Sequence, residues 1–147
     1  MKPNQGRLQT AEHILARTIE HNIPESKFII STFTEESGKI EIYAKTDLRK
    51  IDIMKLQNDV NAIIQKNLQL KKYIIQREEA ETEFDLTRLP SSVKEIRIVE
   101  IEGFDKTPCK DRHVENTSQI GNFEILKVKK TGKDQYRLVF KVNNKSG

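Results

Sequence analysis

The order in which helical and strand-like hydrophobic patterns follow one another constrains the fold of this chain more than any other feature. Residues 7–21 repeat apolar side chains at helical spacing, and Pro24 predicts that this helix ends just before it. We expect Asp52 to be the N-cap of a second helix, whose apolar stripe includes Leu56 and Val60. Segments rich in β-branched or alternating apolar residues predict strands at 28–34, 39–45, 73–76, 94–102, 123–129 and 135–142.

This succession of elements is not a regular βαβ repeat. It predicts an α+β fold with a mainly antiparallel β-sheet and a long helix packed on it. The pair Ser37-Gly38 predicts the turn of a first hairpin, and Gly132 predicts the turn of the last one. Residues 78–83 predict a short acidic helix. The length of 147 residues fits a single domain, 1–147, that is large enough to bury a core.

Composition excludes several classes of protein. The chain has one cysteine, so no intramolecular disulfide can form. No apolar run approaches the roughly 18 residues of a membrane span and no secretory signal is visible, so we expect a cytoplasmic protein with no membrane contact. The net charge is +4, and residues 127–145 concentrate seven Lys or Arg against one acid, Asp134. This stretch is either a mobile basic tail or a surface that contacts phosphates.

The segment 107–113 carries the sharpest local chemistry. Thr107 and Pro108 have the residue types of an N-cap and a first helical position, so we expect a helical turn there. Cys109 and His113 would then share one helix face, and a helix N-terminus favours the thiolate that binds metal. Zinc accepts such mixed ligands. Two other interpretations stay open: a buried thiol beside a surface imidazole, or a Cys–His nucleophile pair.

The predicted first helix supplies a third imidazole. Gln9 and His13 lie four residues apart and therefore share one helix face. His13 is a good metal ligand, whereas the neutral amide of Gln9 is a poor one for zinc. Glu12 lies about 100° around the helix from His13, so we expect it on the surface or at a helix cap, and only secondarily in catalysis.

Taken together, these segments resemble a known family. Residues 9–15, with the sequence Q-T-A-E-H-I-L, resemble the H-T-A-x-H-L-L motif of the alanyl-tRNA synthetase editing domain. Residues 109–121 resemble that family's C-x-x-x-H-V-x-x-T-x-x-I-G motif, and 77–80 also match. The resemblance extends from about Leu8 to Val142. The chain is similar in size to the short free-standing editing proteins of the AlaX type, and the resemblance implies the fold of the alanyl- and threonyl-tRNA synthetase editing domains.

The resemblance implies an enzyme that hydrolyses the ester of mischarged tRNA(Ala), with serine as the usual misattached amino acid and glycine as a lesser one. It implies Zn²⁺ as the cofactor, held by His13, Cys109 and His113, and mischarged tRNA(Ala) as the partner. Gln9 stands where the family has its first histidine ligand. That corner either admits water and keeps the site catalytic, or weakens zinc binding. The oligomeric state stays open.

Further roles follow from the same resemblance. Thr32 matches a threonine in the family's first strand and is the candidate reader of the seryl hydroxyl, whereas Ser31 alternates to the other face. Gln9 is able to hydrogen-bond a water or the terminal adenosine. Asn116 and Thr117 either orient groups around the ligands or contact the ribose, or they simply form a turn. The candidate tRNA phosphate contacts are Lys127, Lys129, Lys130 and Arg137.

Gln9 also keeps two alternatives to catalysis open. One is a tRNA-binding module whose metal site is impaired, and the other is a scaffold of the same fold with neither activity. An editing hydrolase would release serine from seryl-tRNA(Ala), a binding module would hold tRNA without deacylating it, and a scaffold would do neither.

Overall fold

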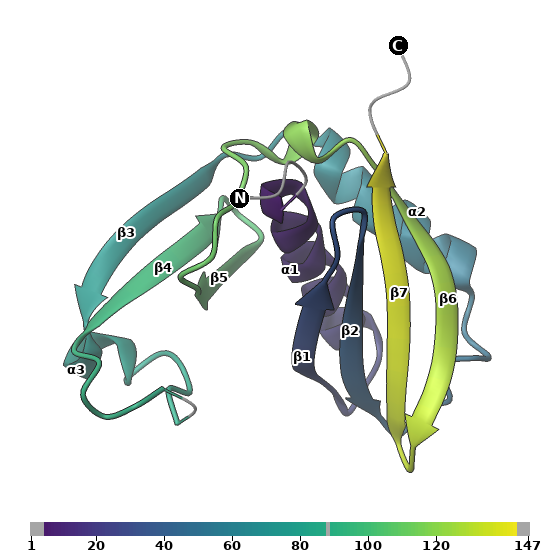
Figure 1. Ribbon diagram of the computed structural model, residues 1–147, viewed down its shortest axis with the longest axis horizontal. Helices are drawn as coiled ribbons and strands as arrows, with labels where there is room; N and C mark the ends of the chain where they lie inside the picture. The colour runs from purple at the N-terminus through teal and green to yellow at the C-terminus, as the bar shows by residue number, and fades with distance from the viewer. Residues whose placement is uncertain (1–4, 88, 144–147) are drawn as a thin grey trace.

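The computed structural model of the protein describes residues 5–87 and 89–143, and it has the α+β fold that the sequence predicts (Figure 1). Its elements in chain order are α1 (Gln5–Asn22), β1 (Ser26–Phe33), β2 (Ser37–Ala44), α2 (Ile53–Gln65), β3 (Leu70–Gln76), α3 (Arg77–Ala80), β4 (Glu95–Ile101), β5 (Asp105–Pro108), the 3₁₀ helix η1 (Thr117–Ile120), β6 (Asn122–Gly132) and β7 (Gln135–Asn143). No helix among the described residues is long and apolar enough to cross a membrane.

The strands form two antiparallel sheets rather than one. The larger sheet has the order β1-β2-β7-β6 and the smaller has the order β3-β4-β5. Figure 1 shows the smaller sheet set apart from the larger one, with α1 between them and α2 beside α1 on the same side of the larger sheet. Strand β1 is therefore an edge strand that faces the space between the two sheets.

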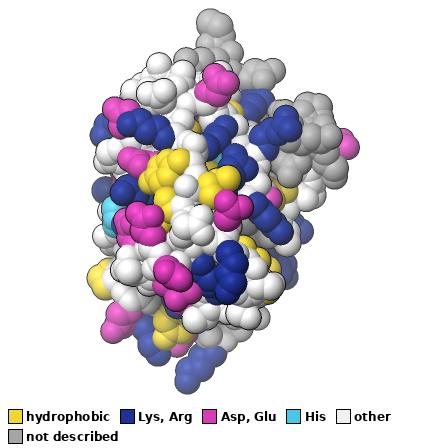
Figure 2. All heavy atoms as spheres, turned by 90° about the vertical axis from the view of Figure 1, so that its left-hand side faces the viewer, with side chains coloured by type: hydrophobic (Ala, Val, Ile, Leu, Met, Phe, Trp, Pro, Cys, Tyr) yellow, Lys and Arg dark blue, Asp and Glu magenta, His cyan; other side chains and the backbone are white. Residues whose placement is uncertain are grey.

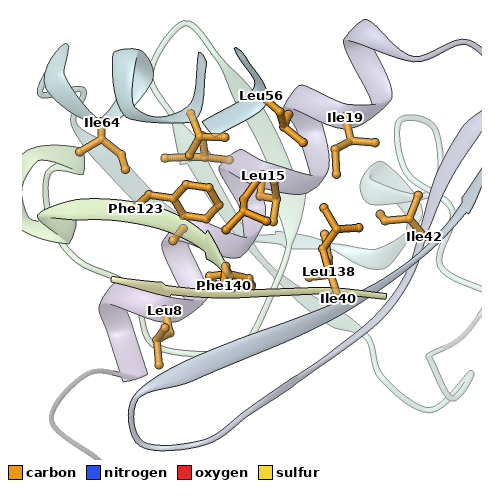
Figure 3. Close-up of a cluster of buried hydrophobic side chains, with 14 of the residues drawn as sticks. Leu8, Leu15, Ile19, Ile40, Ile42, Leu56, Ile64, Phe123, Leu138 and Phe140 are labelled. Atoms are coloured by element: carbon orange, nitrogen blue, oxygen red, sulfur yellow. The ribbon is translucent and has the colours of Figure 1, made fainter. Parts of the chain in front are cut away.

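Helix α1 forms because its apolar side chains recur at helical spacing and are buried along the length of the helix. Its fully buried apolar residues are Leu8, Ala11, Ile14, Leu15 and Ile19. They pack against the inner face of the larger sheet, where Ile40, Leu138 and Phe140 are also fully buried (Figure 3). The Ser26 hydroxyl donates to Ile23 O at 2.7 Å and so satisfies a carbonyl at the end of the helix.

Helix α2 covers the other edge of the larger sheet. Asp52 caps it as predicted, accepting a hydrogen bond from Lys55 N at 3.0 Å. The amide of Asn61 donates to Phe123 O and accepts from Phe123 N, both at 2.9 Å. Gln57 Oε1 accepts from Ile125 N at 2.9 Å. These side chains satisfy backbone groups of the edge strand β6, which would otherwise be open to pairing with another chain.

The predicted hairpin turn at Ser37-Gly38 is wrong by two residues. Both residues lie inside β2, and the turn is formed by 34–36 with the Thr34 hydroxyl accepting from Ser37 N at 3.0 Å. Gly38 is needed for packing instead, because the ring of Phe140 occupies the place that a Cβ would take. In the last hairpin, Gly132 ends β6 and the turn follows at 133–134.

The predicted helix at 107–113 is also wrong. Thr107 and Pro108 end β5, which pairs with the free edge of β4 through Thr107 and Val99. Proline is tolerated at the end of an edge strand because no ladder hydrogen bond is lost there. Beyond it, Cys109 N donates to Arg97 O at 3.0 Å, which continues the attachment to β4. Pairing across the sheet therefore overrides the local helix signal.

A second, smaller core lies under the smaller sheet, where α3 and the segment after it pack on β4. The acidic helix predicted at 78–83 forms as α3, which ends at Ala80. The Arg77 guanidinium organises the following segment. It donates to Pro90 O at 2.7 Å and to Val93 O at 2.9 Å, and Nε pairs with Glu81 at 2.8 Å. This network joins Arg77 to residues on both sides of the segment 83–85.

We expect Gly121→Ala to lower the free energy of unfolding by about 3 kcal/mol, because Gly121 has φ 85° and a Cβ there would collide with the Asn143 carbonyl. Gly103→Ala is the matched control. Gly103 has φ 71° but open space around its Cβ position, so only backbone strain of about 1–2 kcal/mol is expected. Urea unfolding measures both, and equal losses would contradict the role assigned to the collision.

Candidate active site

A cavity of about 700 Å³ lies where α1, β1, β5 and residues 83–85 come together. Its volume is in the range of pockets that enclose small molecules or the end of a larger ligand. The wall between α1 and β5 is held by the ion pair of Arg17 Nε with Asp105 Oδ1 at 3.3 Å. Burial raises the pKa of Asp105 to about 6, and Arg17 opposes this shift only in part.

Three potential metal ligands meet in this part of the molecule. His13 comes from α1, and Cys109 and His113 come from the segment after β5; their ligand atoms all lie within 4.8 Å of one another. His113 Nε2 is 3.4 Å from Cys109 Sγ, and the two imidazole rings meet edge to face with centroids 4.7 Å apart. The sequence predicted this grouping, but an irregular loop rather than a helix brings Cys109 and His113 together.

The Thr10 hydroxyl fixes the orientation of His113. It donates to Gly6 O at 2.8 Å, so its lone pairs remain for two donors. One of these is Val114 N at 3.2 Å and the other is His113 Nδ1 at 3.1 Å. We therefore assign the imidazole proton of His113 to Nδ1. The lone pair of Nε2 is then directed at the ligand cluster, which consists of His13, Cys109 and His113. A fixed tautomer of this kind is the usual support of a metal-binding histidine.

Both imidazoles are neutral at physiological pH. Burial lowers the pKa of His13 to about 4, and burial followed by the proximity of His13 lowers the pKa of His113 to about 3. Neutral imidazole is the form that binds metal. The donor set of two imidazoles and one thiol therefore fits a divalent metal ion of intermediate softness.

The expectation of a thiolate at Cys109 is wrong for the metal-free protein. Burial, followed in smaller measure by the charges of Asp111 and Glu12, raises the pKa of the thiol to about 11. No helix begins at Cys109, so no helix N-terminus favours its ionised form. The thiol is protonated at neutral pH, and metal binding has to displace this proton.

Glu12 is buried and not on the surface as the sequence predicted. It lines the cavity next to His13, with Oε2 at 3.9 Å from His13 Nε2. Burial raises its pKa to about 7, while a hydrogen bond with the Ser31 side chain acts in the opposite direction. The side of α1 that would have faced solvent is covered by β1 and β5, so a polar position on the helix becomes part of the site.

The structure reverses the expected positions of Thr32 and Ser31 relative to the cavity. Ser31 pairs with Ile40, which points into the core, so Ser31 faces α1 and lines the cavity. Thr32 pairs with Lys39 on the opposite face and is exposed. Residues paired across a sheet share a face, and the register of β1 on β2 therefore places Thr32 away from the cavity.

Gln9 is buried one helical turn before His13 and lines the cavity, as its spacing predicted. Asn116 and Thr117 do not line it. Asn116 caps η1, and the fully buried Thr117 hydroxyl donates to Ile64 O at 3.0 Å and accepts from Leu68 N at 2.8 Å. Their side chains therefore hold the loop in place.

The four cationic residues predicted to contact tRNA do not share one face. Lys127, Lys129 and Arg137 lie on the outward face of the larger sheet, because Lys129 pairs with Arg137 and Lys127 pairs with Val139. Lys130 pairs with the buried Tyr136 and so belongs to the other face, near the hairpin end. Beyond these residues, the basic stretch continues to Lys145, which lies outside the described residues.

Comparison with known proteins identifies the family. The profile described as "Threonyl and Alanyl tRNA synthetase second additional domain" matches residues 96–139. The alanyl-tRNA editing protein AlaX-M of Saccharolobus solfataricus is 32% identical over 140 residues, which cover 92% of this chain and 58% of that protein.

The chain belongs to this family of threonyl- and alanyl-tRNA synthetase second additional domains. AlaX-M of Methanosarcina barkeri is 31% identical over 142 residues, covering 91% of this chain and 56% of that protein. The alanine–tRNA ligase of Aeropyrum pernix is 34% identical over 96 residues, which are 63% of this chain and 11% of the ligase. The chain thus spans somewhat more than half the length of the AlaX-M relatives and a small part of the ligase.

Sequence reasoning missed two residues of the site. Thr10 lies inside the first family motif, yet its contact with His113 joins positions 103 residues apart and leaves no local signal. Ser31 was set aside because strand alternation alone does not say which face is buried. Both could have been found only with the register of β1 and the position of the loop after β5.

We expect Thr10→Val to weaken divalent-metal binding by about 10–100-fold, because the variant loses the acceptor that fixes the His113 tautomer. Competition with a chelator measures the affinity. Thr10→Ser keeps the hydroxyl and should bind nearly as the wild type. Thr18→Val is a matched control on the same helix. The Thr18 hydroxyl donates to Ile14 O and forms no other hydrogen bond with the described residues. An unchanged affinity in Thr10→Val would refute the role of Thr10.

Proposed function

We propose that this protein is an aminoacyl-tRNA deacylase that edits mischarged tRNA(Ala), with seryl-tRNA(Ala) as its main substrate and glycyl-tRNA(Ala) as a lesser one. The observation that carries the proposal is the convergence of His13, Cys109 and His113 at a cavity large enough for an aminoacyl end. The relatives named AlaX-M alanyl-tRNA editing proteins support the choice of substrate class. Removal of the misattached amino acid would take place in the cytoplasm.

Such an activity answers a physical limit on amino-acid selection. A synthetase pocket for alanine cannot strongly reject an amino acid that differs by one hydroxyl, since this discrimination reaches only about 100-fold. A second site that requires the hydroxyl discriminates better, because the wrong ligand leaves buried polar groups unpaired. Hydrolysis at that second site removes serine from the tRNA before it is used.

We propose Zn²⁺ as the cofactor, because two neutral imidazoles and a thiol suit it. His13, Cys109 and His113 would hold the ion, and when bound it would supply Lewis-acid polarisation of the ester or activation of a water. Thr10 would keep His113 Nε2 directed at the ion. Cys109 would release its thiol proton to solvent as it becomes a ligand.

The cavity walls would bind and orient the aminoacyl ester. The Gln9 carboxamide, one turn before His13, can donate to the ester oxygen or hold the attacking water. The hydroxyl that faces the cavity from β1 belongs to Ser31, and we assign to it the contact with the seryl hydroxyl that the sequence assigned to Thr32. Glu12, hydrogen-bonded to Ser31, would fix the Ser31 hydroxyl for this contact.

A second candidate function rests on Gln9. The family's motif has a histidine at this position, and an amide is a weaker zinc ligand. A site with three strong donors either keeps an open position for catalysis or holds zinc too weakly to act. In the second case the protein binds tRNA, or acts as a scaffold of this fold, without hydrolysis.

We expect Cys109→Ala to abolish release of serine from seryl-tRNA(Ala) and to lower bound zinc, because one of the three strong donors is lost. Because the Cys109 pKa is about 11, the wild type should release about one proton per zinc at pH 7 and bind zinc more tightly as pH rises. The variant should lack this proton release. His21→Ala is the control, since His21 is an exposed histidine of α1 outside the ligand cluster. Full activity in Cys109→Ala would exclude the proposed metal role.

We expect Gln9→His to raise zinc affinity by at least tenfold, because an imidazole replaces an amide at the fourth corner. Zinc content and deacylation measured together separate the candidate functions. An active wild type whose activity is kept or lowered in the variant supports a catalytic open position. An inactive wild type that gains both zinc and activity identifies an impaired enzyme, and a protein inactive in both forms would exclude the deacylase.

A further inference from the structure

The outward face of the larger sheet is not covered by either long helix. Helices α1 and α2 both lie on the other side of this sheet (Figure 1). Strand register defines the outward face, because paired residues share a side of the sheet. Lys39 of β2 pairs with Val139 of β7, which pairs in turn with Lys127 of β6. These three side chains therefore form a row across three strands, with the two lysines about 10 Å apart.

Positive charge dominates this face. Its cationic side chains come from all four strands, and they are Lys27, Lys39, Lys127, Lys129, Arg137 and Lys141. Its two carboxylates are each paired: Glu41 accepts from Arg137 Nε at 2.7 Å and Glu124 lies 4.0 Å from Lys141. Six cations against two acids give the face a charge of +4, equal to the net charge of the whole chain.

Four lysines of this face form no ion pair with a carboxylate in the described part of the chain. Lys27, Lys39, Lys127 and Lys129 are exposed, and no carboxylate within the described residues forms an ion pair with them. They are therefore free to contact an external anion. We call the surface formed by these four side chains, Arg137 and Lys141 the basic face.

The side of the molecule that carries the smaller sheet is different. Figure 2 views it from the left of Figure 1 and shows Lys or Arg interspersed with Asp or Glu around a few hydrophobic side chains. Two of the cations there pair with nearby acids: Lys106 with Glu83 at 3.7 Å and Arg77 with Glu81 at 2.8 Å. Mixed charges attract a polyanion weakly, whereas cations outnumber acids by six to two on the basic face.

The basic face continues into the cavity across the edge strand β1. Lys27 and Ile30 belong to the outward side through their pairing with Tyr43 and Glu41, and both also line the cavity. Ser31, the next residue, points into it. A chain that lies on the basic face can therefore cross β1 and place its end near His13 without leaving the protein surface.

We propose that the basic face binds the phosphate backbone of the RNA substrate, whose aminoacylated 3′ end crosses β1 to enter the cavity. This inference rests on the proposed function in one respect, that the ester in the cavity belongs to an RNA. Phosphate binding by unpaired lysines displaces counterions, so the contact should be independent of base sequence and sensitive to salt.

The test compares the binding of uncharged tRNA(Ala) by the wild type with that by the triple variant Lys39→Ala/Lys127→Ala/Lys129→Ala. Fluorescence anisotropy measures Kd over a range of salt concentrations. We expect Kd to rise about tenfold or more at 0.15 M salt, and the slope of log K against log salt to fall by about 2–3, roughly 0.7–0.9 for each lost contact. The triple Lys→Arg variant keeps the charges and should bind as the wild type.

The matched control is Lys66→Ala/Lys71→Ala/Lys94→Ala, which removes three exposed lysines that lie off the basic face. It should leave Kd and the salt slope close to the wild type. Equal weakening in both alanine triples would indicate net charge alone and would overturn the inference, as would an unchanged Kd in the first triple. Thermal unfolding of each variant reports whether it is folded.

Deacylation is measured separately so that the two proposals can fail independently. Binding that depends on the basic face in a protein without deacylase activity would refute the proposed function and leave this inference standing. Deacylation by a protein whose tRNA affinity ignores the basic face would leave the function standing and refute the inference. No detectable tRNA binding at low salt would also refute it.

Discussion

The burial of α1 on two sides is the constraint on which the rest of the structure depends. Its apolar stripe packs into the core of the larger sheet, where Leu8, Ile14 and Ile19 are fully buried. Its polar side is covered by the edge strand β1 and by the segment around β5, which places Glu12 and His13 inside a cavity instead of in water. One helix thus supplies both the packing that holds the fold and part of the polar surface that forms the site.

A single hydroxyl connects this helix to the loop that completes the ligand cluster. Thr10 bonds to its own helix, to the backbone of Val114 and to His113 Nδ1. Those contacts set both the position of the loop and the tautomer of the imidazole. Burial then keeps both histidines neutral and the thiol protonated. The metal-free protein therefore holds three neutral donors without the repulsion that two imidazolium ions would cause, and only the thiol has to lose a proton.

Charge is divided between two regions that meet at β1. The cavity contains several acids, among them Glu12, Asp105 and Asp111, while the outward side of the larger sheet carries the unpaired lysines. An aminoacylated RNA has the complementary division, with a positive ammonium group at its end and negative phosphates along its length. The edge strand joins the two regions because its residues alternate between them, as Ile30 and Ser31 do.

The sequence by itself determined the long helix, the N-cap at Asp52, six of the strands and the residues of the ligand cluster, because each depends on local periodicity or on a short motif. It did not determine the strand at 105–108, since that segment forms a strand only because β4 offers a free edge. The sequence analysis assigned Thr32 and Ser31 to the wrong faces of β1, because the pairing of β1 with β2 decides which face is buried. The burial of Glu12, the contact of Thr10 with His113 and the basic face join residues that are distant in the chain. Only the tertiary structure could decide them, because strand register and the packing of α1 fix which distant residues become neighbours.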